Sequence, residues 1–195
     1  MTRPDPEAFA RSYVETLKGV LDALPLADLA RALDVLEATH AAGRQLLIAG
    51  NGGSAATASH MANDLVWGLV QQRLPGLKAI ALGDGLPLVT AIANDRGYDE
   101  VFAVQVANLG RPGDVLLVIT GSGNSPNVLR ALETAKGLGM TTVGFLGRGG
   151  GKALALVDVP VIVPSDDYGP IEDVHMVFDH LAIAYLRARL GAASR

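Results

Sequence analysis

Histidine and carboxylate side chains recur at spacings that could bring them around one metal ion. His60 and Asp64 are four residues apart, which puts them on one face of a helix. Glu172 and His180 are eight residues apart, a little over two helical turns, so they lie on roughly the same side of a later helix. Two imidazoles and two carboxylates suit Zn²⁺ or a similar borderline metal ion. Charged residues on amphipathic helices are commonly solvated, however, so spacing alone leaves a metal site and a solvated surface both open.

Two further polar residues, His175 and Asp179, belong to the same late helical stretch. The apolar residues of that stretch recur at helical spacing and form one stripe: Ile171, Val174, Phe178, Leu181 and Tyr185. We therefore expect the polar residues to lie beside the buried face of this helix rather than inside it. His175 could alternatively be a core or interface histidine.

Two glycine-rich stretches each stand between an apolar run and a helical pattern. Residues 50–54 read Gly-Asn-Gly-Gly-Ser, and residues 120–126 read Thr-Gly-Ser-Gly-Asn-Ser-Pro. Glycine lets the backbone approach a ligand closely, and a helix start offers free N–H groups and the positive end of the helix dipole. Both stretches therefore fit an anion site, although each could be an ordinary strand-to-helix turn with a serine cap.

The second stretch adds hydroxyl groups to these backbone donors. Pro126 suits the first position of a helix, and Ser125 suits the cap before it. The hydroxyls of Thr120, Ser122 and Ser125, together with backbone amides, match the oxygens of a phosphate monoester. The stretch contains no lysine, so it is not a nucleotide P-loop. Two such stretches on one sheet favour a shared phosphosugar site over two capped turns.

A third candidate loop covers residues 93–97 and contains Asn94 and Asp95. These two side chains could bond sugar hydroxyls. Equally, Asn and Asp favour helix caps and turns for local reasons, so a cap and a turn explain them as well.

The elements that must position these groups are indicated by five short apolar runs, at residues 45–50, 79–82, 114–120, 141–146 and 159–163. Continuous apolar runs separated by helical stretches are typical of a parallel sheet that is covered on both faces. We expect the helices near residues 54–66, 98–109, 126–138 and 171–190. Pro160 would place the last strand at an edge of the sheet. Ligands of such sheets bind beyond the carboxyl ends of the strands, where the glycine-rich stretches fall.

The first forty residues read as two helices that precede the first strand. Apolar residues recur at helical spacing from about Pro6 to His40, and Pro25 interrupts the pattern. Because these helices precede the sheet, they are not crossover connections, and they could pack on a neighbouring subunit. We expect one domain over residues 1–195, with helices used in oligomer packing over 1–42 and an α/β core over 43–195.

Composition narrows the class of protein. The chain has 195 residues, a formal net charge of −4 and no cysteine. The charge argues weakly against a nucleic-acid partner, and the absence of cysteine fits a cytoplasmic protein. The acidic residues near the N-terminus do not match a signal peptide, and no apolar run reaches the length of a membrane span. We therefore expect a cytoplasmic protein with a small-molecule partner, no nucleic acid and no membrane.

Taken in order, the motifs resemble the sugar isomerase (SIS) family, and within it the phosphoheptose isomerase branch. The motifs that carry the resemblance, which covers nearly the whole chain, are residues 50–54, His60, Asn94-Asp95, residues 122–125, Glu172, His175 and His180. The resemblance implies an α/β three-layer sandwich with a five-stranded parallel sheet, in a flavodoxin-like SIS fold, and a homotetramer with sites at subunit interfaces. It also implies an aldose–ketose isomerase that interconverts sedoheptulose 7-phosphate and D-glycero-D-manno-heptose 7-phosphate, with bound Zn²⁺.

The resemblance further assigns roles to individual residues. The positions expected to bind substrate are Asn51, Gly52, Gly53, Ser54, Asn94, Asp95, Thr120, Gly121, Ser122, Ser125 and Glu172. The positions expected to bind the metal are His60, Asp64, Glu172 and His180. Isomerisation moves a proton between C1 and C2. Asp64, or Glu172 if Asp64 is too short, is expected to act as the base, and His180 to carry the second proton.

Some positions depart from the family pattern. The family usually has glutamate at the position of Asp64 and glutamine at that of Glu172, and it often has an arginine near Trp67. The pair Thr120-Gly121 replaces a more hydroxyl-rich pair. These departures leave two alternatives open: an isomerase of a related phosphosugar, and a non-catalytic phosphosugar-binding regulatory SIS protein. The two histidines, at 60 and 180, argue against the second alternative, because a pure binding module needs no proton-transfer pair.

Overall fold

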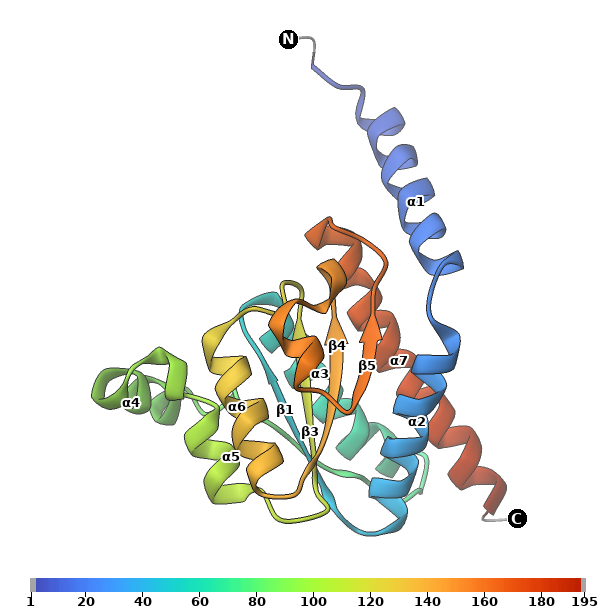
Figure 1. The fold of residues 1–195 in the computed structure, drawn as a ribbon. Helices are drawn as coiled ribbons and strands as arrows, with labels where there is room; N and C mark the ends of the chain where they lie inside the picture. Colours follow the sequence, from blue (N-terminus) through green and yellow to red (C-terminus); the bar gives the residue numbers. More distant parts are fainter. Residues whose placement is uncertain (1–2, 194–195) are drawn as a thin grey trace.

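Five parallel strands form a single sheet, as the sequence predicts, and their order is β2-β1-β3-β4-β5. Figure 1 labels β1, β3, β4 and β5. The structure is a computed structural model and describes residues 3–193. The strands are β1 (Gln45–Gly50), β2 (Lys78–Ala81), β3 (Val115–Thr120), β4 (Thr141–Leu146) and β5 (Val159–Ile162). Strand β3 lies at the centre and is buried along its whole length, and β5, with Pro160, is an edge strand as predicted.

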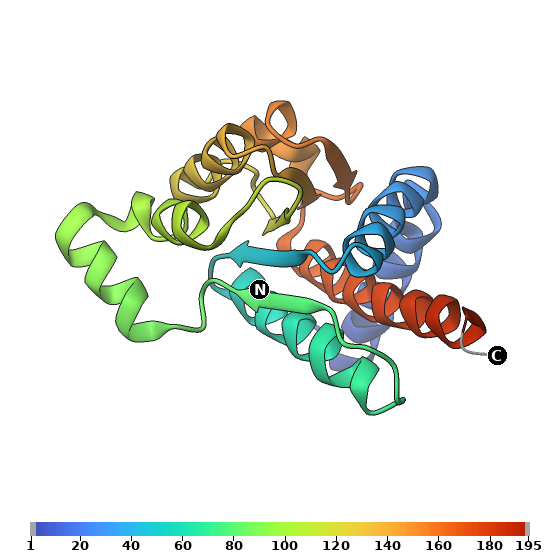
Figure 2. The ribbon, with the colours of Figure 1, turned by 90° about the horizontal axis from the view of Figure 1, so that it is seen from below.

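Alternate residues of β1 point to opposite faces of the sheet and divide the core in two. Leu46 and Ile48 belong to the core on one face, and Leu47 and Ala49 to the core on the other. The first face is covered by α2 (Leu26–Ala41), α3 (Gly53–Asn63) and α7 (Tyr168–Ala193), and the second by α5 (Ala103–Leu109) and α6 (Pro126–Gly137). Figure 2 shows helices on both sides of the sheet, which explains why the strands read as continuous apolar runs. None of the helices between residues 3 and 193 is both long and apolar enough to span a membrane.

Helix α1 (Pro6–Asp22) extends away from the body of the protein (Figure 1). The break between α1 and α2 lies beside Pro25, where the sequence predicts it. Helix α1 contacts the body through the Tyr13 hydroxyl, which donates a hydrogen bond of 2.6 Å to Asp173. Phe9 and Val14 are 64% and 49% exposed, so part of the apolar side of α1 is uncovered within the described chain.

One expected loop is instead the end of a helix. Residues 93–96 form the last turn of α4 (Leu86–Arg96), which stops at Gly97 with φ of 104°. Pro87 lies in the first turn of α4, where a missing backbone N–H does no harm, and this start signal identifies the helix. The expectation of a loop at residues 93–97 is therefore wrong. Figure 1 shows α4 standing out from the body of the molecule.

Two other predicted helices are interrupted. The stretch expected over 98–109 begins with a 3₁₀ turn, η2 (Tyr98–Glu100), before α5. The stretch expected over 54–66 leaves α-helical geometry after Asn63 and continues as a π-helical turn, η1 (Asp64–Gly68). Such π turns occur frequently at functional sites, and this one begins at a predicted metal ligand.

Candidate active site

The two predicted glycine-rich loops meet at the carboxyl ends of β1 and β3. Together with the start of α7 they enclose a hollow of about 150 Å³, which we call the junction pocket. Its lining residues are Asn51, Ser54, Ile119, Thr120, Gly121, Ser122, Ser125, Tyr168 and Glu172. Helices α3 and α6 begin at this pocket, so free N–H groups and the positive ends of two helix dipoles lie there. The lining offers hydroxyls, amides and the carboxylate of Glu172, but no lysine or arginine.

The hydroxyls of the second loop are oriented by the backbone of that loop. Thr120 Oγ1 accepts a hydrogen bond of 3.1 Å from the Gly123 N–H, and Ser122 Oγ accepts one of 3.2 Å from the Asn124 N–H. Each hydroxyl therefore keeps its own O–H to donate. Ser125 holds the N-cap position of α6, as predicted, but its side chain makes no capping hydrogen bond. The Ser125 hydroxyl and the first N–H groups of α6 thus stay available to an anion.

Glycine is required at two positions of the first loop because other atoms lie close. A Cβ on Gly50 would lie 2.7 Å from the carbonyl oxygen of Ser54, and a Cβ on Gly53 would lie 2.8 Å from Glu172 Oε2. The Glu172 carboxylate therefore lies against the first turn of α3, where the helix dipole favours a negative group. The structure places Glu172 in the junction pocket.

Asn51 is held in one orientation by two partners. Asn51 and Asn127 exchange two amide hydrogen bonds of 2.9 Å, and the Tyr98 hydroxyl donates another of 2.9 Å to Asn51 Oδ1. Both lone pairs of Oδ1 are then used, and one N–H of Asn51 remains. Asn51 can therefore offer a ligand only a donor, which suits an anionic oxygen. Sequence patterns do not single out Asn127 or Tyr98, because each acts through Asn51.

A third glycine-rich segment, residues 147–153, supports the second loop. The Ala153 N–H donates to the Gly123 carbonyl at 2.9 Å, and the Lys152 N–H donates to Asn124 Oδ1 at 3.1 Å. Gly123 has φ of 63°, and a Cβ there would collide with the Gly150 carbonyl. The glycine run directly after β4 is a sequence signal that could have found this segment.

Four side chains with ligating atoms meet between α3 and α7, further along the helices than the junction pocket. His60, Asp64, Asp179 and His180 each offer one atom, and these atoms lie within 4.8 Å of one another. We call this group the histidine–aspartate cluster. His60 Nε2 lies 3.3 Å from His180 Nε2, 3.7 Å from Asp64 Oδ2 and 3.8 Å from Asp179 Oδ2. The cluster could hold a divalent metal ion, and it unites three of the four predicted ligands, whereas Glu172 lies in the junction pocket.

Asp179 joins the cluster from inside the core. It has no exposed surface, so the expectation that it lies beside the buried face is wrong, whereas His175, at 1% exposed, matches the alternative of a core histidine. The sheet and the neighbouring helices cover more of the circumference of α7 than its apolar stripe occupies, so polar residues beside the stripe are buried as well. Burial, followed by the charge of Asp64, raises the pKa of Asp179 to about 7, and His60 opposes the rise. Burial lowers the pKa of His175 to about 4, so this imidazole is neutral near pH 7.

Asn94 and Asp95, both predicted to bind substrate, are not among the residues that line the junction pocket. They are exposed at the end of α4, where Asn94 Nδ2 donates a hydrogen bond of 2.8 Å to Asp95 Oδ1. Asp95 lines a different hollow, together with Arg96 and Asn108. Within one chain, these two residues therefore stand apart from the two loops.

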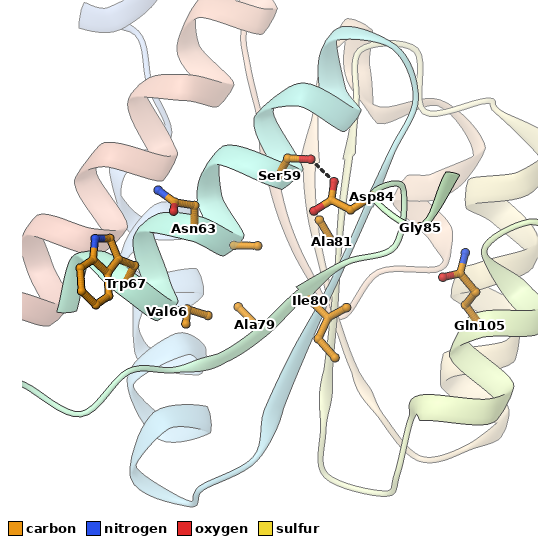
Figure 3. A pocket seen from close by; sticks show the side chains of 11 residues that line it. Ser59, Asn63, Val66, Trp67, Ala79, Ile80, Ala81, Asp84, Gly85 and Gln105 are labelled. Atoms are coloured by element: carbon orange, nitrogen blue, oxygen red, sulfur yellow. Dashed lines mark hydrogen bonds between the residues drawn. The ribbon is translucent and has the colours of Figure 1, made fainter. Parts of the chain in front are cut away.

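A larger hollow of about 490 Å³ lies along edge strand β2 and is separate from these groups (Figure 3). Its lining is mostly apolar and includes Val66, Trp67 and Ile80, which are 41%, 55% and 40% exposed. Ser59 and Asp84 are hydrogen-bonded to each other in this hollow, as Figure 3 shows. The lining contains no imidazole and none of the predicted site residues, so size alone does not identify the site.

Known proteins with similar sequences share one family. The model of the SIS domain family matches residues 8–147 of this chain. The phosphoheptose isomerase of Trichlorobacter lovleyi is 46% identical over 157 residues, which cover 80% of this chain and 78% of the relative. The phosphoheptose isomerase of Helicobacter pylori (strain HPAG1) is 50% identical over 137 residues, which cover 70% of this chain and 71% of the relative.

Solved structures agree with the sequence comparison. A phosphoheptose isomerase from Francisella tularensis matches with a TM-score of 0.85 and 32% identity, covering 93% of this chain and 96% of the other. The phosphoheptose isomerase GmhA from Neisseria gonorrhoeae matches with a TM-score of 0.84 and 33% identity, covering 93% of this chain and 98% of the other. The similarity therefore includes the N-terminal helices as well as the sheet.

Proposed function

The chain belongs to the SIS domain family and is an isomerase of phosphoheptoses, and we propose that it interconverts sedoheptulose 7-phosphate and D-glycero-D-manno-heptose 7-phosphate. The observation that carries this proposal is that the junction pocket and the histidine–aspartate cluster lie along the same two helices. Ser54 and His60 are six residues apart on α3, which is about 9 Å at a rise of about 1.5 Å per residue. Seven carbons joined by bonds of about 1.5 Å extend roughly 8 Å. One heptose phosphate can therefore span both places.

In this proposal the junction pocket binds the phosphate. The residues that bind it are Asn51, Gly52, Gly53, Ser54, Thr120, Gly121, Ser122 and Ser125, through hydroxyls, the Asn51 amide and backbone N–H groups. The neutral donors are supported by Arg148, whose Cζ lies 5.4 Å from the ring centroid of the pocket residue Tyr168. Binding at this remote end holds the reacting carbons in a fixed position, which lowers the entropic part of the barrier.

The proton transfer is assigned to side chains of the two helices. Asp64 takes the proton from carbon, and His180 exchanges the second proton with the neighbouring oxygen as the enediol forms and collapses. Glu172, the alternative base expected from the sequence, lines the junction pocket at the phosphate end, so this proposal assigns the proton transfer at the reacting carbons to Asp64. A divalent metal ion bound at the cluster would polarise the carbonyl and hydroxyl oxygens.

The side chains present fit Zn²⁺, which is the metal we propose. Zinc binds imidazole nitrogen and carboxylate oxygen at about 2.0–2.2 Å, so two ligand atoms of a tetrahedral site are roughly 3.4 Å apart. The separations of 3.3, 3.7 and 3.8 Å from His60 Nε2 to its three neighbours are close to that value. Small side-chain movements would complete the geometry.

We also propose that the chain acts as a cytoplasmic homotetramer, with the helices of residues 1–42 used in packing. Pockets that enclose small ligands usually measure about 300–1,000 Å³, so the junction pocket of about 150 Å³ covers only part of the sugar. Exposed apolar residues on α1 and along β2 support contacts between copies. In such an assembly, Asn94 and Asp95 on the projecting α4 would contact substrate across an interface. The net charge of −4 supports a small-molecule partner rather than nucleic acid.

The test is turnover of sedoheptulose 7-phosphate by the purified protein, followed by NMR of the two sugars. We expect His180→Ala and Asp64→Asn each to lower turnover by about 10²–10⁴-fold, the usual range for removing an acid or base. His40→Ala is the matched control, because His40 contacts the Pro75 carbonyl at the far end of α2.

Two results would contradict the proposal. Unchanged turnover in both variants would remove the assigned proton-transfer roles. A wild-type protein that leaves the heptose phosphate untouched but isomerises a shorter ketose phosphate would instead identify an isomerase of a related phosphosugar.

A further inference from the structure

Asp179 is a buried carboxylate whose oxygens have no hydrogen-bond partner in the described part of the chain. It is 0% exposed, and neither oxygen has a hydrogen bond there. Another buried carboxylate shows the usual situation: Asp114 is 4% exposed and accepts hydrogen bonds from the Gln45 N–H, Gln45 Nε2 and the Arg111 N–H. Buried carboxylates are normally paired, hydrogen-bonded or bound to a metal, so Asp179 lacks something that Asp114 has.

One oxygen of Asp179 lies among the other members of the histidine–aspartate cluster. Asp179 Oδ2 lies 3.8 Å from His60 Nε2, and one oxygen fits within the 4.8 Å group formed with Asp64 and His180. The two imidazoles also meet through the same kind of atom, with Nε2 facing Nε2 at 3.3 Å. Four ligating atoms thus converge. Two of them are the imidazole Nε2 atoms, and a hydrogen bond between these can contain only one proton.

Glu172 does not share this position. It lies two helical turns before His180, which is about 12 Å along α7 at a rise of about 1.5 Å per residue. Its carboxylate touches the first turn of α3 beside Gly53 and lines the junction pocket. Asp179 is adjacent to His180 in sequence and already within the cluster.

We propose that Asp179, in place of Glu172, is the fourth ligand of the metal ion, so that His60, Asp64, Asp179 and His180 hold it within a single chain. This inference rests on the proposed function, in that it concerns the metal of the same site. Two carboxylates and two imidazoles neutralise a divalent ion and satisfy the buried oxygen of Asp179. Glu172 is then left in the junction pocket, facing the sugar phosphate rather than the metal.

The experiment compares zinc binding by three isosteric variants of the full chain. Zinc content is measured by elemental analysis and affinity by competition with a chromophoric chelator. We expect Asp179→Asn to weaken zinc binding by at least about 100-fold, because loss of an outer partner alone typically weakens it by about 10–100-fold. We expect Glu172→Gln to bind zinc as the wild type does. Asp173→Asn is the matched control, because Asp173 is half-buried beside Glu172 and bonds Tyr13 of α1 rather than the cluster, and its zinc binding should also be unchanged.

Melting temperatures separate loss of a ligand from loss of the fold. We expect zinc to raise the melting temperature of the wild type relative to chelator, and to have no such effect on Asp179→Asn or Asp179→Ala. A zinc-dependent increase equal to that of the wild type in either variant would overturn the inference. So would loss of zinc by Glu172→Gln.

Turnover by the wild-type protein keeps this inference distinct from the proposed function. A wild type that isomerises the heptose phosphate while Asp179→Asn binds zinc normally would remove only the role of Asp179. A wild type that binds no zinc would remove this inference and the proposed metal together.

Discussion

Helices α3 and α7 contribute to both the junction pocket and the histidine–aspartate cluster, yet the polar groups of the two sites are satisfied in opposite ways. In the pocket, Thr120, Ser122 and Asn51 are oriented by hydrogen bonds within the chain. In the cluster, two imidazole nitrogens face each other, and Asp179 has no hydrogen bond to any described residue. The donors of the pocket are thus oriented by loop backbone, whereas the cluster contains a buried carboxylate with no hydrogen bond, a situation that a bound ion would relieve.

The largest effect is expected where the pocket depends on backbone alone. Gly123→Ala should lower the free energy of unfolding by about 3 kcal/mol or more, because a left-handed conformation adds about 1–2 kcal/mol and the new Cβ meets the Gly150 carbonyl. Urea unfolding measures the change. Gly137→Ala at the end of α6 is the control: its Cβ meets nothing, and stability should rise by up to about 1 kcal/mol. A Gly123 variant as stable as the wild type would show that the pocket is not preformed.

The second prediction concerns the cluster and is tested by the pH dependence of the free energy of unfolding, measured in the presence of chelator. The folded-state pKa of Asp179, about 7, lies above its usual value near 4, so the folded state binds more protons and stability falls as pH rises between them. His175 has the opposite sign: its folded-state pKa, about 4, lies below the usual 6.5, so stability rises with pH over that interval. The two slopes partly cancel in the wild type.

Asp179→Asn should therefore unmask the slope of His175. We expect its free energy of unfolding to rise by up to about 3 kcal/mol between pH 4 and 6.5, at about 1.4 kcal/mol per pH unit. Urea unfolding at several pH values in chelator checks this. A variant profile that matches the wild type would mean that Asp179 is already satisfied without metal, and the contrast between the two regions would fail.

A smaller effect is expected at the amide pair that orients Asn51. Asn127→Ala removes both hydrogen bonds to Asn51 and the one from the Val128 N–H, and it leaves Tyr98 as the partner of Asn51, so we expect a loss of about 1–2 kcal/mol in stability and a KM roughly tenfold higher. Steady-state kinetics and urea unfolding measure the two quantities. Asn108→Ala, an exposed asparagine on α5, is the control for a general loss of an amide. An unchanged KM would show that Asn51 needs no orientation.

The smallest effect should come from the outermost hydrogen bond of that network. Tyr98→Phe removes one bond to Asn51 Oδ1 from a side chain that is 57% exposed, while Asn127 remains in place. We expect Tyr98→Phe to weaken substrate binding by about 0.5 kcal/mol, which corresponds to about a twofold increase in KM. The same kinetic assay measures it. A change larger than that of Asn127→Ala would reverse the order of importance and point to direct contact between Tyr98 and substrate.

The sheet and both loops could be predicted from the sequence because their signals are local. Apolar runs such as residues 115–120 are continuous because both faces of the sheet are covered, and glycine positions such as Gly50 and Gly53 are fixed by close approach. The parallel order of strands then brings both loops to one edge without any further information.

The residues that make up the cluster and the pocket could not all be predicted, because their membership depends on distances between elements that residue spacing in the sequence does not give. Glu172 and Asp179 both share helix α7 with His180, and only the position of α3 decides that Asp179 enters the cluster while Glu172 enters the pocket. Asn94 and Asp95 resemble a loop by composition, but the proline start of α4 makes them the end of a helix. The support given by residues 147–153 involves a loop almost thirty residues away in the chain.

The two imidazoles of the cluster are separated by 120 residues of chain. Ribosomes add about 5–20 residues per second, so roughly 6–24 s pass between the synthesis of His60 and that of His180. A nascent chain that ends before Asp179 carries the glycine loops and two of the four cluster residues, yet it cannot close the cluster. Metal binding at the proposed site would therefore wait for the last helix, and a chain that stops between the start of α7 and Asp179 would contain all five strands but an incomplete cluster.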